Sequence, residues 1–269
     1  MQKIPFRQFP RILICTALIQ ATAAPVVVRH TEGLVHGFLV LSSMDGTPLA
    51  QGDLTQVAAA NNQVTNHVVF RFKDGSVRDE TAVYSQRGNF RLLSYRLTQK
   101  GPAFEQRTEM SFDTSKGEVT VRYTDDGKEK VATDQMELPL DIANGMIFTL
   151  LKNLRPDGPA ITVSMVTATP KPRLVKLQIA PEGEDPFSVG GSKRMATHYV
   201  LKVEIGGVAG VIAPLLGKKP PDIHVWILGG EAPAFVKSEG PLYYGGPNWR
   251  IELASPVWPR PSSGDSGKR

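Results

Sequence analysis

The sequence predicts a mainly β protein, built as a single strongly curved antiparallel sheet or incomplete β-barrel with one central helix near residues 142–154. Between Leu34 and Tyr123, apolar and polar residues alternate in short runs, which is the period of half-buried strands. Turn-forming pairs separate these runs, so consecutive strands are expected to pair antiparallel. A content of 41% hydrophobic and 21% charged residues excludes a wholly disordered chain, a coiled coil and a collagen.

The first 23 residues have the pattern of an export signal. Three basic residues precede the apolar run 12–19, and residues 21–23 read Ala-Thr-Ala, which fits the small-x-small pattern of signal peptidase sites. We therefore expect cleavage after Ala23 and an exported protein, in the periplasm or outside the cell. The apolar run is too short to span a bilayer and no longer one follows, so no transmembrane anchor is expected.

Removal of this segment changes both charge and cysteine content. The net charge of +5 falls to +2, with 28 basic against 26 acidic residues, and basic residues alternate with acids along the strands. This pattern does not favour a nucleic-acid partner. The single cysteine, Cys15, lies in the removed segment, which excludes a thiol nucleophile, a disulfide framework and a cysteine metal site from the mature chain.

The first half of the mature chain predicts a meander of strands. Residues 67–73 place Val68, Phe70 and Phe72 on one face, and Asp74-Gly75 follows as a tight hairpin turn with positive backbone angles. Further turns are expected at the glycine-containing pairs. The strands and turns that continue the meander are at 77–84, 90–98, 104–112, Lys116-Gly117, 119–123 and Asp125-Asp126-Gly127.

One segment departs from the strand period and predicts the helix. Asp141 is in position to cap its N-terminus, and Arg155-Pro156 ends it. Gly145 lowers helix propensity by about 1 kcal/mol relative to alanine, so we expect the helix to depend on packing against the sheet. The apolar residues at helical spacing are Ile147, Leu150, Leu151 and Leu154.

Strand patterns resume after the helix at 161–167, 173–179, 195–205, 222–228, 234–238 and 249–253. In the longest of them, Tyr199 and Leu201 share one face and His198 lies on the other. Residues 24–254 are expected to form a single β-rich domain. The tail 255–269, rich in Pro, Ser and Gly, is expected to be disordered.

No motif in the sequence specifies a reaction. HExxH, GxSxG and Ser-x-x-Lys are all missing, and the glycines at 206–210 lack the order of a nucleotide-binding loop. His198 and His224 are on strands that allow them to be neighbours, as a metal pair, an acid–base pair or ordinary surface histidines. The acidic residues at 182–185 predict a solvated loop, with calcium binding as the alternative. We expect no metal and no cofactor.

Two stretches are candidates for ligand contact. The uncharged run 206–217 contains Val211, Ile212 and Leu215 and is followed by two lysines, so it is either a plug closing one end of the sheet or a lid that touches lipid. The aromatic end of the chain includes Trp226 and Trp249, which either pack the last strands or form a ligand wall.

The order of elements resembles the periplasmic lipoprotein-carrier superfamily of the LolA and LolB type and related uncharacterised bacterial envelope proteins. The segments 225–227, 234–237 and 251–253 are similar to the last strands of that uncharacterised group. The resemblance implies an incomplete barrel whose concave face, partly covered by helix, accepts acyl chains. The segment 206–221 departs from the pattern.

Three functions remain open from the sequence. The first is an exported, non-enzymatic protein that binds a lipid or other apolar small molecule in the concave sheet. The second is an envelope scaffold with a filled barrel that binds an envelope protein partner, and the third is a hydrolase with dispersed residues. For the first function, the candidate ligand-binding residues are Ile147, Leu150, Leu151, Leu154, Val211, Ile212, Leu215, Trp226 and Trp249.

Overall fold

The computed structural model describes residues 25–189, 191–204 and 220–254. The expected export signal 1–23, the tail 255–269 and the candidate residues Val211, Ile212 and Leu215 lie outside these ranges. One helix, α1 (Ile147–Lys152), and fourteen strands make up the described part. The strands are β1 (Val35–Ser43), β2 (Pro48–Ala58), β3 (Gln63–Phe72), β4 (Val77–Arg87), β5 (Asn89–Lys100), β6 (Thr108–Asp113), β7 (Glu118–Asp125), β8 (Lys128–Gln135), β9 (Ile161–Val166), β10 (Leu174–Val189), β11 (Ser192–Glu204), β12 (Ile223–Leu228), β13 (Ala234–Pro241) and β14 (Asn248–Leu253).

All fourteen strands belong to one antiparallel sheet that does not close. Its order is β8-β7-β6-β5-β4-β3-β2-β1-β14-β13-β12-β11-β10-β9, so every pair of neighbours is consecutive in the chain except β1 and β14. The two ends of the order, β8 and β9, are separate edges. This arrangement confirms the predicted mainly β fold with an incomplete barrel.

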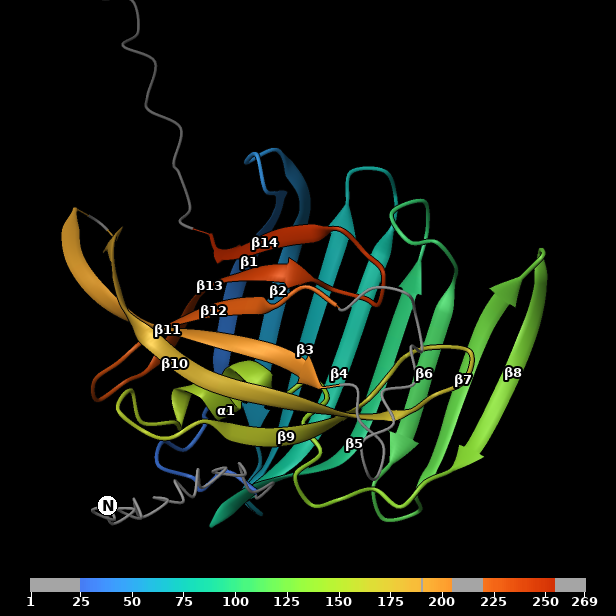
Figure 1. Ribbon diagram of the computed structural model, residues 1–269, viewed down its shortest axis with the longest axis horizontal. Coiled ribbons are helices and arrows are strands. Elements are labelled where there is room, and N and C mark those ends of the chain that lie inside the picture. The colour runs from blue at the N-terminus through green and yellow to red at the C-terminus, as the bar shows by residue number, and fades with distance from the viewer. Residues whose placement is uncertain (1–24, 190, 205–219, 255–269) are drawn as a thin grey trace, which may run out of the picture.

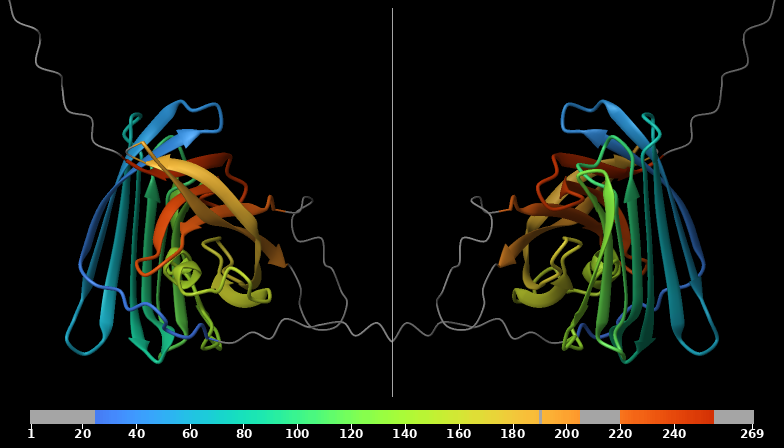
Figure 2. Two further views of the ribbon diagram at one scale, coloured as in Figure 1. Left: turned by 90° about the vertical axis from the view of Figure 1, so that its left-hand side faces the viewer. Right: turned by 90° about the vertical axis from the view of Figure 1, so that its right-hand side faces the viewer.

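The sheet folds over on itself and forms two facing walls. We call β1–β8 the first wall and β9–β14 the second wall. In Figure 1 the orange and red strands of the second wall lie across the blue and green strands of the first. The side views of Figure 2 show α1 between the two walls, so the segment that joins β8 to β9 fills part of the concave space.

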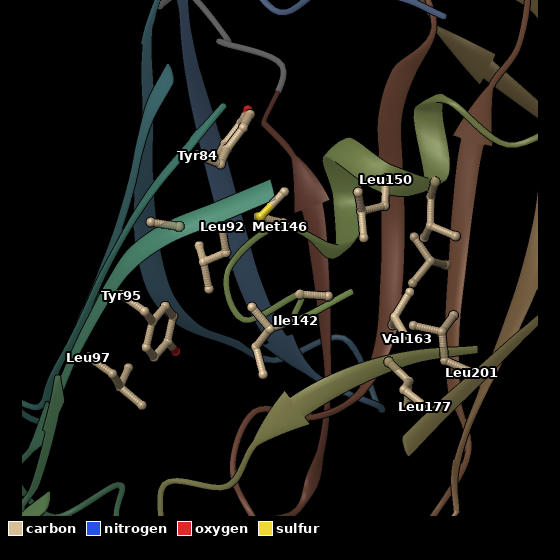
Figure 3. Packing of buried hydrophobic residues seen from close by; sticks show 14 of the residues in the cluster. Tyr84, Leu92, Tyr95, Leu97, Ile142, Met146, Leu150, Val163, Leu177 and Leu201 are labelled. Atoms are coloured by element: carbon tan, nitrogen blue, oxygen red, sulfur yellow. The ribbon is translucent and has the colours of Figure 1, made fainter. Parts of the chain in front are cut away.

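Side chains from both walls and from α1 form one hydrophobic core. Figure 3 shows Tyr84 and Tyr95 of the first wall facing Leu177 and Leu201 of the second wall, with Leu150 of α1 between them. All five are buried. Because alternate side chains of a strand point to opposite faces, the strands that reach this core contribute mainly alternate residues to it, whereas edge strand β8 has no buried residue.

Two predicted turns differ in how they are built. Asp126 (φ 49°) and Gly127 (φ 72°) form the two-residue connection between Asp125 and Lys128, as the Asp-Gly pattern predicts. At 74–75 only Gly75 has a positive φ (86°), whereas the Asp74 carboxylate accepts a hydrogen bond from the backbone N–H of Ser76 at 2.8 Å. The turn prediction is confirmed there, but its expected pair of positive angles is wrong.

The predicted helix 142–154 is too long, since α1 spans only Ile147–Lys152. Gly145 precedes it with a φ of 69°, in the left-handed region that interrupts a helix. Its close surroundings fix this conformation, because a Cβ at Gly145 would lie 2.8 Å from Cβ of Ala82. The helix therefore begins only after the chain has turned away from β4.

Asp141 does not cap the helix, contrary to the expectation. Both its carboxylate oxygens accept hydrogen bonds from the hydroxyl of Ser164 at 3.0 Å. The backbone N–H of Ala143 donates to the carbonyl of Ser164 at 2.8 Å. The backbone N–H of Ser164 also donates to the carbonyl of Asp141 at 3.1 Å, so edge strand β9 uses a carbonyl that a helix capped at Asp141 would have used internally.

The expected acidic loop at 182–185 is instead part of a strand. The β10–β11 hairpin pairs Glu184 with Thr197 and Asp185 with Ala196, beyond a register shift between Pro181 and Gly183. Strand pairing depends on backbone hydrogen bonds, so exposed charged residues can belong to a strand. The apolar pattern predicts a strand only as far as 179, whereas β10 continues to Val189. At 104–112 the predicted strand is instead too long at its start, because β6 begins only at Thr108.

Candidate functional site

A cavity of about 220 Å³ lies between the two walls and α1. Close-packed protein interiors contain few voids larger than a water molecule. An engineered cavity of about 150 Å³ lined by aliphatic and aromatic side chains binds benzene, so this space is large enough for a small apolar molecule. Most of its lining is apolar and includes Leu54, Phe70, Phe148, Leu201, Val225 and Ile251.

The helix forms one side of the cavity through residues 147–149 and Lys152. Phe148 of α1 stacks on Phe235 of β13, with ring centroids 4.2 Å apart and planes inclined by 27°. Such aromatic pairs are stabilised by the interaction between the rings in addition to the apolar area that they bury. Ser238 and Gly240, also on β13, are two small residues that line the same cavity.

The first wall contributes a buried ion pair to the same cavity. Arg78 and Glu80 are two apart on β4 and therefore point the same way. Nη1 of Arg78 donates to Oε2 of Glu80 at 2.7 Å, and the hydroxyl of Tyr95 donates to Oε1 of Glu80 at 2.5 Å. Both oxygens of the Glu80 carboxylate thus have partners.

The protonation of this cluster follows from its surroundings. Burial alone raises the pKa of Glu80, but the charge of Arg78 and the hydrogen bonds from Arg78 and Tyr95 lower it below the usual value of a glutamate. Burial and the Glu80 charge raise the pKa of Tyr95 well above that of a free tyrosine. At neutral pH Glu80 is ionised and Tyr95 keeps its proton.

One polar atom of the cluster has no hydrogen-bond partner among the described residues. Nε of Arg78 is buried and makes no hydrogen bond to the described residues. The whole Arg78 side chain is only 9% exposed. A buried donor without an acceptor costs free energy, and native proteins contain few of them.

A second ion pair lies at the other end of α1. Nζ of Lys152, which lines the cavity, is 2.6 Å from Oε1 of Glu32. The side-chain amide of Gln56, another lining residue, donates to Oε2 of Glu32 at 2.7 Å. The charges of Lys152 and Glu32 therefore compensate each other inside the fold.

The structure separates the residues that the sequence analysis grouped together. Ile147 and Trp249 line the cavity. Leu150 and Leu151 are buried in the core and do not line the cavity. Leu154 follows the helix and borders surface grooves near the N-terminal segment. The role of these residues in binding stays a prediction.

Trp226 lies away from the cavity, in a polar cluster on the opposite face of the second wall. Its ring stacks on His198 with centroids 4.5 Å apart, and its Nε1 donates to Oδ2 of Asp185 at 2.7 Å. Nζ of Lys237 lies 3.8 Å from the ring centroid on Trp226. Neighbours on β12, Val225 and Ile227, face the core instead, so alternation of side chains places Trp226 outside.

The predicted proximity of His198 and His224 is confirmed. Nε2 of His198 and Nδ1 of His224 are 2.9 Å apart, and Nδ1 of His198 is 3.8 Å from Oδ2 of Asp185. Burial and the neighbouring His224 lower the pKa of His198, while Asp185 and Glu182 oppose that shift.

The residues described contain no group of three or more His, Cys, Asp or Glu side chains that could hold a metal ion. Within the same ranges, no helix has the length and apolar character needed to cross a membrane.

The sequence reasoning missed Phe148, Arg78 and Glu80. Phe148 follows Ile147 directly and is not one of the apolar positions at helical spacing, so the pattern did not indicate it. Arg78 and Glu80 are charged residues on a half-buried strand, and only the register of β4 against its neighbours shows that they point inward.

Comparisons with known proteins give little further identification. No protein-family model matches the chain, and no curated protein matches it. A search of solved structures finds similarity to the crystal structure of a beta-barrel-like protein of domain of unknown function DUF1849 from Brucella abortus. The identity is 12%, the match covers 84% of this chain and 98% of that chain, and the TM-score is 0.45.

Proposed function

We propose that this protein is an exported, non-catalytic binder of a small apolar or amphiphilic ligand, which it holds in the cavity between its two walls. The observation that carries the proposal is the cavity of about 220 Å³, with apolar side chains from both walls and from α1 around it. Ligand sites are typically concave, mainly apolar and provided with a few placed polar groups, and this cavity has that composition.

The cavity favours binding over the scaffold alternative. A barrel that serves only as a scaffold is expected to have a filled interior at the packing density of other proteins. Here the lining side chains, which include Phe70 and Phe148, leave about 220 Å³ unfilled. The open sheet edge between β8 and β9 lets the two walls separate without breaking a strand pair.

The first experiment is native mass spectrometry of the mature protein from an envelope fraction, with organic extraction of bound molecules. A copurifying apolar or amphiphilic molecule supports the proposal.

A cavity-filling variant tests the location. Val68 lines the cavity from β3, and Val68→Phe adds a ring to the space. Val83→Phe on β4 is the matched control, because Val83 alternates with the buried Ala82 and Tyr84 and points to the opposite face. We expect Val68→Phe to lose binding of a small apolar fluorophore and Val83→Phe to keep it. Equal binding by both folded variants would contradict the proposed location.

A further inference from the structure

We infer that the cavity selects uncharged amphiphiles whose head carries a hydrogen-bond acceptor, such as an ester or amide carbonyl, and that Arg78 receives this head. Free carboxylates of the same size are excluded. The inference rests on the proposed function and specifies the class of ligand.

The first step is the balance of charge. Three charged side chains line the cavity among the residues described: Arg78, Glu80 and Lys152. Arg78 pairs with Glu80 at 2.7 Å, and Lys152 pairs with Glu32 at 2.6 Å. Each positive charge has its own carboxylate, so an incoming anion finds no uncompensated cation.

The second step is the remaining hydrogen-bonding capacity. Oε1 and Oε2 of Glu80 already accept bonds from Tyr95 and Arg78. Nε of Arg78 is buried and donates to no described residue. The atom of the cluster that has no partner among the described residues is therefore a donor, and a ligand must bring an acceptor to pair with it.

The third step separates neutral from charged acceptors. A carboxylate that reaches Arg78 also comes close to the ionised Glu80, and like charges in a poorly solvated space repel strongly. An ester or amide carbonyl accepts the same hydrogen bond without this repulsion. The ion pair thus acts as a polar anchor that distinguishes ligands by charge.

The size of the cavity suggests the probes. Scaling from the engineered cavity of about 150 Å³ that holds benzene, 220 Å³ accommodates about nine heavy atoms. Methyl hexanoate has this size and presents an ester carbonyl. Hexanoate has the same acyl chain with a free carboxylate, so the two probes differ mainly in the charge of the head.

The experiment measures dissociation constants of methyl hexanoate and hexanoate at pH 7 for the mature protein and for Glu80→Gln. Glutamine keeps the shape of the side chain and removes its charge, which leaves Arg78 uncompensated. We expect the unmodified protein to prefer the ester at least tenfold and Glu80→Gln to bind hexanoate at least tenfold more tightly than the unmodified protein does. Asp79→Asn is the control, since Asp79 pairs with His67 at 3.0 Å on the opposite face and its loss is expected to leave both constants unchanged.

A second variant keeps the inference testable if Glu80→Gln does not fold. Arg78→Met/Glu80→Met removes both charges together, which proteins tolerate better than an unpaired buried charge. With hexane as a third probe that has no acceptor, we expect the unmodified protein to bind methyl hexanoate more tightly than hexane and the double variant to lose this preference. Equal affinity of the unmodified protein for ester and carboxylate would overturn the inference and leave the proposed function standing, whereas binding of neither probe would overturn both.

Discussion

Glu32 and Lys152 form an ion pair of 2.6 Å across 120 positions of the chain. The Glu32 side chain is 6% exposed and the Lys152 side chain 16%, so the pair is largely removed from water. It attaches the segment before β1 to the end of α1. Gln86 of β4 holds the same segment to the first wall, because its side chain accepts from the backbone N–H of Glu32 at 2.6 Å and donates to its carbonyl at 3.0 Å.

Breaking this pair from one side is expected to destabilise the protein more than removing both charges. Glu32→Gln leaves Lys152 without its carboxylate, and an uncompensated buried charge costs about 3 kcal/mol. The double variant Glu32→Gln/Lys152→Met is expected to recover part of that loss. Urea denaturation of the single and double variants measures the coupling. Arg155→Ala serves as the control, because its pair with Asp157 is exposed to water and contributes little to stability. Additive effects of the two changes would contradict the coupling.

Gly52 and Gly37 provide a matched test of packing on neighbouring strands. A Cβ at Gly52 would lie 2.6 Å from Cε1 of Phe70 and 2.9 Å from Cβ of Leu39, whereas a Cβ at Gly37 meets its nearest atom, on Leu54, at 3.8 Å. Gly52→Ala is therefore expected to cost about 1–3 kcal/mol through overpacking. Gly37→Ala is expected to change stability by about 0.5 kcal/mol or less. Thermal and urea unfolding of both variants check this, and equal midpoints would refute the contrast.

Asn144 completes the edge of the second wall. Its side chain donates to the carbonyl of Val166 and accepts from the N–H of the same residue, both at 2.9 Å, and it is buried. Asn144→Ala leaves these backbone groups of β9 unpaired, at an expected cost of about 2 kcal/mol. Hydrogen exchange at the amide of Val166 is expected to become faster, while Asn66→Ala, which removes one bond of 3.3 Å, leaves it unchanged. An unchanged rate of hydrogen exchange at the Val166 amide in Asn144→Ala would show that β9 is held by other contacts.

The strands were predictable where local alternation and tight turns coincide. Val68, Phe70 and Phe72 do share the inner face of β3, and the Asp126-Gly127 turn has the expected angles. Both features depend on a few adjacent residues. They require no knowledge of the partner strand.

The site was less predictable because its polar groups depend on long-range register. On β4 the inward residues Arg78 and Glu80 are no more apolar than the outward Asp79 and Thr81, so composition does not identify the inner face. Pairing with β3 and β5 decides it. The helix was overestimated for a related reason, since the bonds between Asp141 and Ser164 connect positions that no local pattern relates.

The histidine pair predicts how stability depends on pH. Burial and the proximity of His224 lower the pKa of His198 in the folded protein below the unfolded value of about 6.5, against the opposing charges of Asp185 and Glu182. The unfolded chain therefore binds the proton more readily, and the contribution of His198 is complete above about pH 6.5 and is lost as the pH falls through the folded pKa. His198→Gln removes this titration. Urea unfolding between pH 8 and pH 5 is expected to show a smaller loss of stability in His198→Gln than in the unmodified protein. Parallel curves for the two proteins would contradict the assignment.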